Sequence, residues 1–142
     1  MIEPERMIIM NASSESVGKS KEDYLEAILI IKERQGYVRS TDVADQLGVT
    51  KPSVSYATRH LKEDGYIVSD HAGMLILTDS GRKIAERIYL RHRILTKLFT
   101  DLGVSEAQAS SDACMIEHDL SDETFDAICR HCGVNLKSFN ET

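Results

Sequence analysis

Residues 41–61 read TDVADQLGVTKPSVSYATRHL, and this stretch decides the fold. The spacing of its apolar residues predicts a short helix from Thr41 to Leu47, and Gly48 is a typical C-terminal stop. Thr50 is a good N-cap for a second helix, with Pro52 in its first turn and Val54, Ala57 and Leu61 on its buried face. Two helices joined by the turn at 48–50 are the pattern of a helix-turn-helix.

The second helix of this motif has the surface that a recognition helix needs. Its outer face combines small hydrogen-bond donors, one aromatic ring and two cations: Lys51, Ser53, Ser55, Tyr56 and Arg59. Such residues reach base edges and neutralise phosphates, so this face predicts binding to double-stranded DNA. Further candidate phosphate contacts are Arg39, Lys62, Arg82 and Lys83. The alternative is a winged helix used only for protein contacts.

The segments around this motif predict a mainly α-helical protein. A helix opens at Ser20, with Asp23 as a capping partner, and carries an apolar stripe that includes Tyr24, Leu25 and Ile28. Residues 66–69 and 74–77 predict a β-hairpin wing. Helices are then expected from Asp79 to about Asp101, from Ser105 through residue 118, and from Ser121, where Phe125 and Ile128 would face inward.

We therefore predict an N-terminal winged helix-turn-helix followed by an α-helical metal-binding and dimerisation domain. The boundaries are a flexible arm at 1–19, a DNA-binding domain at 20–78 and the helical domain at 79–142.

Composition agrees with a soluble, cytoplasmic globular protein. No apolar run approaches the roughly 18 residues that span a bilayer, so no membrane association is expected. Taken alone, the formal net charge of −6 argues against binding to nucleic acid. However, residues 20–90 hold ten basic and eleven acidic side chains, whereas residues 91–142 hold five and nine. The acidic excess therefore lies in the part predicted to bind metal.

A second motif in the sequence indicates a metal-binding site. Cys114, Glu117 and His118 stand at i, i+3 and i+4, so on a continuous helix they would share one face. Thiolate, carboxylate and imidazole together suit Fe, Mn, Co, Ni or Zn better than Mg or Ca. Three ligands are too few, and the chain offers Asp23 and Glu26 on the first helix and His92 on the long helix. Each also has an ordinary interpretation as a helix cap, solvated charge, phosphate contact or core thiol.

Five segments in order resemble the diphtheria-toxin-repressor family of iron- and manganese-dependent regulators. They are KEDYLE (21–26), VTKPSVS (49–55), LILTDSG (75–81), RHR (91–93) and CMIEHDLS (114–121). The resemblance implies a homodimeric, non-enzymatic repressor that binds an inverted-repeat operator when loaded with Fe²⁺ or Mn²⁺. It also implies DNA contacts at Thr50, Pro52, Ser53, Ser55 and Tyr56. The chain is too short for the SH3-like third domain of the iron branch.

The resemblance implies metal ligands at Asp23, Glu26, His92, Cys114, Glu117 and His118. Asp23 and Glu26 resemble the manganese branch, whereas Cys114 resembles the iron branch. The iron branch's further ligands fall on Thr96 and Ser110, which are poor ligands. Because thiolate is soft and Mn²⁺ is hard, we favour Fe²⁺ as co-repressor, then Mn²⁺, and expect Zn²⁺, Co²⁺ or Ni²⁺ to bind in vitro.

Other interpretations remain. A metalloenzyme would need a nucleophile, a base and an oxyanion site, which the sequence does not identify. A winged-helix regulator of an organic ligand, with a vestigial metal site, is the principal alternative. Cys129 and Cys132 form a single C-x-x-C, for which burial of both thiols on one helix face is the ordinary explanation.

Overall fold

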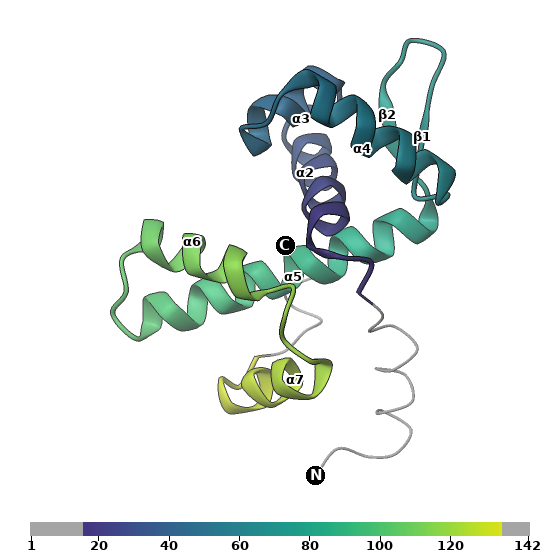
Figure 1. Ribbon diagram of the computed structural model, residues 1–142. Helices are drawn as coiled ribbons and strands as arrows, with labels where there is room; N and C mark the ends of the chain where they lie inside the picture. The colour runs from purple at the N-terminus through teal and green to yellow at the C-terminus, as the bar shows by residue number, and fades with distance from the viewer. Residues whose placement is uncertain (1–15, 135–142) are drawn as a thin grey trace. The chain divides into compact units, whose positions relative to one another are not determined.

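The computed structural model describes residues 16–134, and Figure 1 shows their course. The elements are α2 (Lys19–Gln35), α3 (Ser40–Leu47), α4 (Lys51–Glu63), β1 (Ile67–Ser69), β2 (Leu75–Leu77), α5 (Asp79–Asp101), α6 (Glu106–Ile116) and α7 (Asp122–His131). The predicted fold class is confirmed. Residues 1–15 of the predicted N-terminal arm lie outside the described residues.

The described chain forms two compact units, residues 17–88 and residues 89–134. The division falls at Tyr89, within α5, whereas the sequence led us to draw it before that helix at Asp79.

The first unit is a winged helix-turn-helix. Helix α2 packs on α3, α4 and β2, and its predicted apolar stripe is buried, with Leu25 and Ile31 fully enclosed. Strands β1 and β2 pair antiparallel, with Ile67 opposite Leu77. The Leu75 amide also donates to the carbonyl of Val38 at 2.8 Å, which ties the wing to the segment after α2.

Of the two N-caps predicted in this unit, the structure confirms that of α4 but not that of α2. The Thr50 hydroxyl accepts the Ser53 amide at 3.2 Å, so the predicted cap of α4 is confirmed. The predicted cap at Ser20 is wrong. Helix α2 begins at Lys19 after Gly18, whose φ of 101° favours glycine, and Asp23 pairs with Lys19 at 2.8 Å instead.

The inner face of α4 also differs from the prediction at one position. Thr58 is buried where we expected Ala57, because its hydroxyl donates to the Val54 carbonyl at 2.8 Å. A hydroxyl satisfied within its own helix can enter a core without an orphaned polar group.

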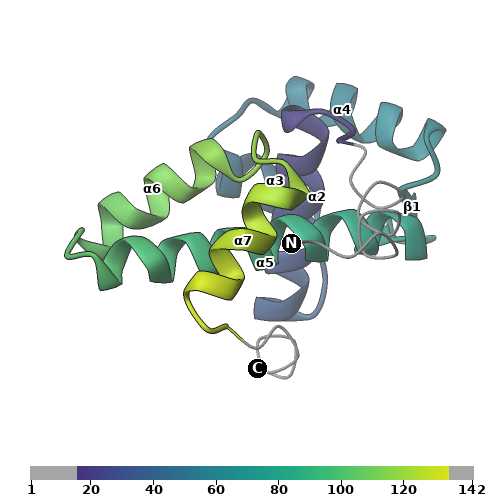
Figure 2. The same cartoon turned by 90° about the horizontal axis from the view of Figure 1, so that it is seen from below.

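The second unit consists of the C-terminal half of α5 with α6 and α7. Figures 1 and 2 both show α6 running alongside α5. Ser105 and Ser121 cap α6 and α7 as predicted, each accepting a backbone amide three residues ahead. The inward face of α7 departs from the prediction. Asp126 and Cys129 are buried, whereas Phe125 and Ile128 are half-buried.

Gly81 sets how closely α5 approaches the wing. A Cβ atom at this position would lie 2.0 Å from the carbonyl oxygen of Tyr66, far inside van der Waals contact. This oxygen belongs to the backbone and already accepts a hydrogen bond from the Thr78 amide at 3.0 Å. The start of α5 therefore requires a residue without a side chain.

Gly81→Ala should lower the free energy of unfolding by about 1–3 kcal/mol, because overpacking displaces backbone. Elsewhere inside a helix, the same change stabilises by about 1 kcal/mol. Urea denaturation gives the value, with Lys83→Ala on the exposed face of α5 as the control. A gain in stability for Gly81→Ala would show that the close approach is wrong.

Candidate metal centre and nucleic-acid interface

The six predicted metal ligands are divided between the two units. Asp23 and Glu26 lie on α2 in the unit of residues 17–88. The other four lie in the unit of residues 89–134: His92, Cys114, Glu117 and His118.

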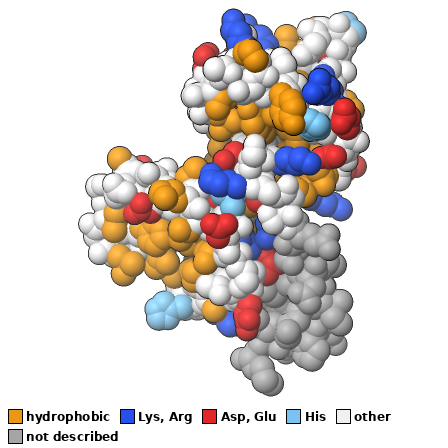
Figure 3. Space-filling model, in the orientation of Figure 1, with side chains coloured by type: hydrophobic (Ala, Val, Ile, Leu, Met, Phe, Trp, Pro, Cys, Tyr) orange, Lys and Arg blue, Asp and Glu red, His pale blue; other side chains and the backbone are white. Residues whose placement is uncertain are grey.

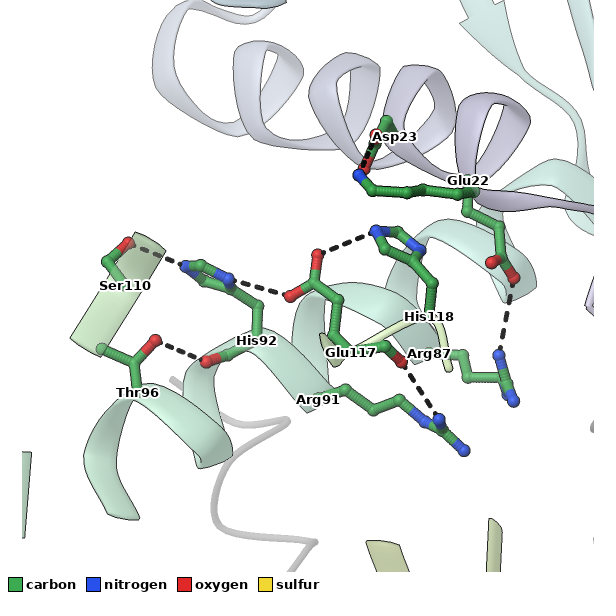
Figure 4. Close-up of polar contacts among 10 residues, drawn as sticks. Glu22, Asp23, Arg87, Arg91, His92, Thr96, Ser110, Glu117 and His118 are labelled. Carbon is green, nitrogen blue, oxygen red and sulfur yellow. Dashed lines mark hydrogen bonds and ion pairs between the residues drawn. The ribbon is translucent and has the colours of Figure 1, made fainter. Parts of the chain in front are cut away.

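In the second unit, the structure places Glu117 between two imidazoles (Figure 4). Glu117 Oε2 lies 2.9 Å from Nδ1 of His92, and Oε1 lies 3.3 Å from Nε2 of His118. The Glu117 side chain is completely buried, and that of His118 is 1% exposed. The three side chains come from α5 and from the turn after α6, so the tertiary fold assembles them.

Two opposing effects set the ionisation of Glu117. Burial raises the pKa of this carboxyl, but hydrogen bonds from His118 and His92 lower it more, so the net pKa lies below the ordinary value. Glu117 is therefore an anion whose two oxygens both face imidazole nitrogens. A buried anion with two imidazoles matches the nitrogen and oxygen donors that first-row divalent cations accept. These residues fit a metal ion, which would replace protons on the imidazoles.

The predicted helix through residue 118 is too long. Helix α6 ends at Ile116, Glu117 is its C-cap, and residues 117–119 form a turn. Glu117 keeps helical dihedral angles and its amide donates to the Ala113 carbonyl, so it stays on the helical face of Cys114, whereas His118 lies in the turn. Cys114 is half-buried in α6. The shared-face argument from helical spacing therefore holds for Cys114 and Glu117, while His118 lies just beyond the C-cap of α6.

Two small hydroxyl residues hold His92. Ser110 Oγ lies 3.2 Å from the Nε2 of His92, and the Thr96 hydroxyl donates to the His92 carbonyl at 2.7 Å. These are the two positions where the iron branch was expected to supply further ligands. In this chain, Ser110 contacts one ring nitrogen while Glu117 contacts the other, which fixes the orientation of the ring.

In the first unit, Asp23 and Glu26 are one helical turn apart on α2. Asp23 is half-buried and Glu26 is buried. The preceding residue, Glu22, is 1% exposed and lies 3.6 Å from the guanidinium of Arg87 on α5. That ion pair ties α2 to the part of α5 within the same unit.

Sequence reasoning missed Arg91, which is completely buried. Its guanidinium donates to the carbonyls of Glu117 and Leu120 and to the carboxylate of Asp122. A signal was available. Positions 84, 88 and 95 are apolar and share one face of α5, and Arg91 interrupts that stripe.

The predicted DNA-reading residues form one exposed surface. All seven are exposed: Thr50, Lys51, Pro52, Ser53, Ser55, Tyr56 and Arg59. Tyr56 is 61% exposed, and the Arg59 guanidinium lies 5.5 Å from the centre of its ring. The ring of His60 packs against the same tyrosine, with the centroids 4.5 Å apart. An exposed aromatic side chain is thus held in place beside a cation.

Among the candidate phosphate contacts, Arg39 is the most constrained. It forms two hydrogen bonds of 3.1 Å with Asp42, whose carboxylate also accepts the Arg39 amide at the start of α3. Lys62, Arg82 and Lys83 are exposed.

Three further observations concern the surface. Hydrophobic side chains gather over the α5–α6 side of the second unit in Figure 3, and its exposed apolar residues include Leu102 and Met115. Within residues 16–134, no helix is both long and apolar enough to cross a bilayer. Of the C-x-x-C pair, Cys129 is buried but Cys132 is exposed, so joint burial is wrong.

Comparisons with known proteins match both units. Residues 16–74 match the model of the iron dependent repressor N-terminal DNA binding domain, and residues 78–137 match that of the iron dependent repressor metal binding and dimerisation domain. The HTH-type transcriptional regulator MntR of Geobacillus kaustophilus is 40% identical over 109 residues, which is 77% of each chain.

Solved structures agree with these matches. The crystal structure of T. acidophilum IdeR is 28% identical with a TM-score of 0.72, and the match covers 84% of this chain. A manganese-dependent transcriptional repressor in complex with manganese is 32% identical with a TM-score of 0.72, and the match covers 80% of this chain. The chain spans 56% and 52% of the lengths of these two solved chains, respectively.

Two of these relatives, MntR and the manganese-dependent repressor, are named as transcriptional regulators, which agrees with the prediction that the chain is not an enzyme. The segment matched to the DNA binding domain contains the winged helix with its exposed surface on α4. The segment matched to the metal binding domain contains the buried Glu117 between two imidazoles. The chain belongs to the iron-dependent repressor family.

Proposed function

We propose that this protein is a cytoplasmic, metal-activated repressor that binds DNA as a homodimer and controls metal-homeostasis genes. The observation that carries the proposal is the buried Glu117 between His92 and His118, in a chain whose other unit is a winged helix with an exposed reading face. The matched family is described by metal binding, which favours a metal over an organic ligand as the signal.

The proposed metal ligands are Asp23, Glu26, His92, Cys114, Glu117 and His118. Because α2 packs on α3 and α4, metal bound to Asp23 and Glu26 would constrain the reading surface. The bound ion would supply positive charge among the buried carboxylates. By linkage, DNA would tighten metal binding by the same factor by which metal tightens DNA binding.

For the metal, the relatives shift our preference. The sequence favoured Fe²⁺ narrowly because Cys114 is a soft ligand. The 40% identical relative is MntR, and a structural relative is a complex with manganese, whereas the family description names iron. We therefore propose Mn²⁺ first and Fe²⁺ second, with Zn²⁺, Co²⁺ and Ni²⁺ as ions that bind in vitro.

The proposed DNA target is an inverted-repeat operator, which a two-fold symmetric dimer reads with two copies of α4. The residues proposed to contact it are the seven exposed ones that begin with Thr50 and end with Arg59. The apolar surface of the second unit is a suitable dimer contact, in keeping with the matched dimerisation domain.

Mn²⁺ should raise the affinity for DNA by about 5–150-fold, the usual range of coupling between two sites. The probe is a duplex selected from a random pool in the presence of Mn²⁺, and the readout is fluorescence anisotropy with and without chelator. Glu117→Gln should abolish the increase, because the neutral amide cannot balance a divalent cation.

The matched control is Glu123→Gln, an exposed carboxylate on α7 of the same unit. Anaerobic Fe²⁺ is the second metal tested. Equal DNA affinity with chelator and with either metal would contradict the proposal.

Cys114→Glu should shift metal preference towards Mn²⁺, since it replaces a soft thiolate with a hard carboxylate. The expected result is a fall in the ratio of Zn²⁺ affinity to Mn²⁺ affinity by at least tenfold in competition titrations. Cys132→Ser changes an exposed thiol and is the control. An unchanged ratio would remove Cys114 from the proposed ligand set.

A further inference from the structure

The turn after α6 carries both Glu117 and His118, and its backbone has little support from regular structure. Residues 117–119 form a turn and Leu120 a bend before α7 begins at Asp122. The last carbonyls of a helix have no partner within it. The turn has its own Asp119 amide bond to the Ile116 carbonyl at 3.0 Å, but the carbonyls of Glu117 and Leu120 point elsewhere.

Arg91 supplies the partner for both carbonyls. One nitrogen, Nη1, donates to the Glu117 carbonyl at 3.1 Å and to the Leu120 carbonyl at 2.5 Å. The other, Nη2, donates to the Asp122 carboxylate at 2.5 Å, and the ring of Phe125 lies 5.1 Å from the guanidinium carbon. The Arg91 guanidinium thus joins the end of the turn to the first residue of α7, and the ring of Phe125 lies beside it.

This arrangement is specific to arginine. Arginine has five donors in a rigid plane and stays ionised, so it can serve three acceptors from a buried position. Lysine carries the same charge on a single atom and cannot reproduce the fork. Burying an unpaired cation would be strongly unfavourable. The ion pair with Asp122, whose side chain is 16% exposed, offsets the free-energy cost of burying the Arg91 charge.

Arg91 and His92 are consecutive residues of α5, and both contact Glu117. Arg91 binds the backbone of Glu117, while His92 contacts its carboxylate (Figure 4). The carboxylate therefore cannot move away from His92 without either rotating its side chain or breaking the backbone contact.

We infer that Arg91 is a positioning residue for the metal centre: through the Glu117 and Leu120 carbonyls and Asp122, it pre-forms the turn that presents Glu117 and His118 to a divalent cation. This inference rests on the proposed function. A turn that is already ordered needs no ordering when the ion binds, so Arg91 raises metal affinity without contacting the metal.

The experiment compares Arg91→Lys and Asp122→Asn with wild type in the full chain. Mn²⁺ affinity is measured by calorimetry at a temperature where circular dichroism shows each variant folded. Both variants should lose about 10–100-fold in affinity, the range found for groups that orient metal ligands. If Arg91→Lys does not fold, Asp122→Asn decides the question, because that residue is only half-buried.

The control is Arg130→Gln, which breaks the Arg130–Asp126 ion pair of α7 in the same unit and leaves the turn intact. Mn²⁺ affinity within threefold of wild type in folded Asp122→Asn would overturn the inference. So would an equal loss in Arg130→Gln, since the effect would then reflect general destabilisation.

Amide hydrogen exchange of the metal-free protein separates this inference from the proposed function. Asp122→Asn should speed exchange at Asp119 at least tenfold while the interior of α6 stays protected, and Arg130→Gln should not. If wild type bound no Mn²⁺ but this pattern appeared, the proposed function would fail and the positioning of the turn would stand. Unchanged exchange at Asp119 would overturn the inference even if metal binds.

Discussion

The requirement to balance buried charge organises the second unit. Glu117 and Arg91 are both completely buried, and neither could remain so alone. The imidazoles of His92 and His118 face the carboxylate of Glu117, while two carbonyls and Asp122 accept hydrogen bonds from the Nη atoms of Arg91. Because these partners come from α5, the turn after α6 and the start of α7, charge balance also fixes the packing of the three helices.

In the first unit, steric fit has the corresponding role. Gly81 lets α5 start against the backbone of Tyr66, which also accepts the Thr78 amide. The same helix pairs Arg87 with the buried Glu22 next to Asp23. The proposed ligands on α2 and the exposed face of α4 thus belong to one packed body. A constraint on α2 would therefore reach the reading surface through packed side chains.

How much the sequence predicts depends on whether an interaction is local. The helix-turn-helix, the wing and the caps at Thr50, Ser105 and Ser121 follow from neighbouring residues and are confirmed. The end of α6 at Ile116 is not predicted, because Arg91, about 26 positions away in sequence, binds the carbonyl of Glu117. Thr58 replaces Ala57 inside because its hydroxyl bonds its own helix. For the proposed metal ligands, the sequence identifies candidate residues, and tertiary packing brings His92 to Glu117.

The central proposal is that Asp23 and Glu26 bind metal together with His92, Cys114, Glu117 and His118. The direct measurement is Mn²⁺ affinity of the double variant Asp23→Asn, Glu26→Gln beside the control Glu33→Gln, an exposed carboxylate on the same helix. We expect the double variant to lose at least a hundredfold in affinity and the control to match wild type. Wild-type affinity in the double variant would remove Asp23 and Glu26 from the proposed ligand set and contradict the account.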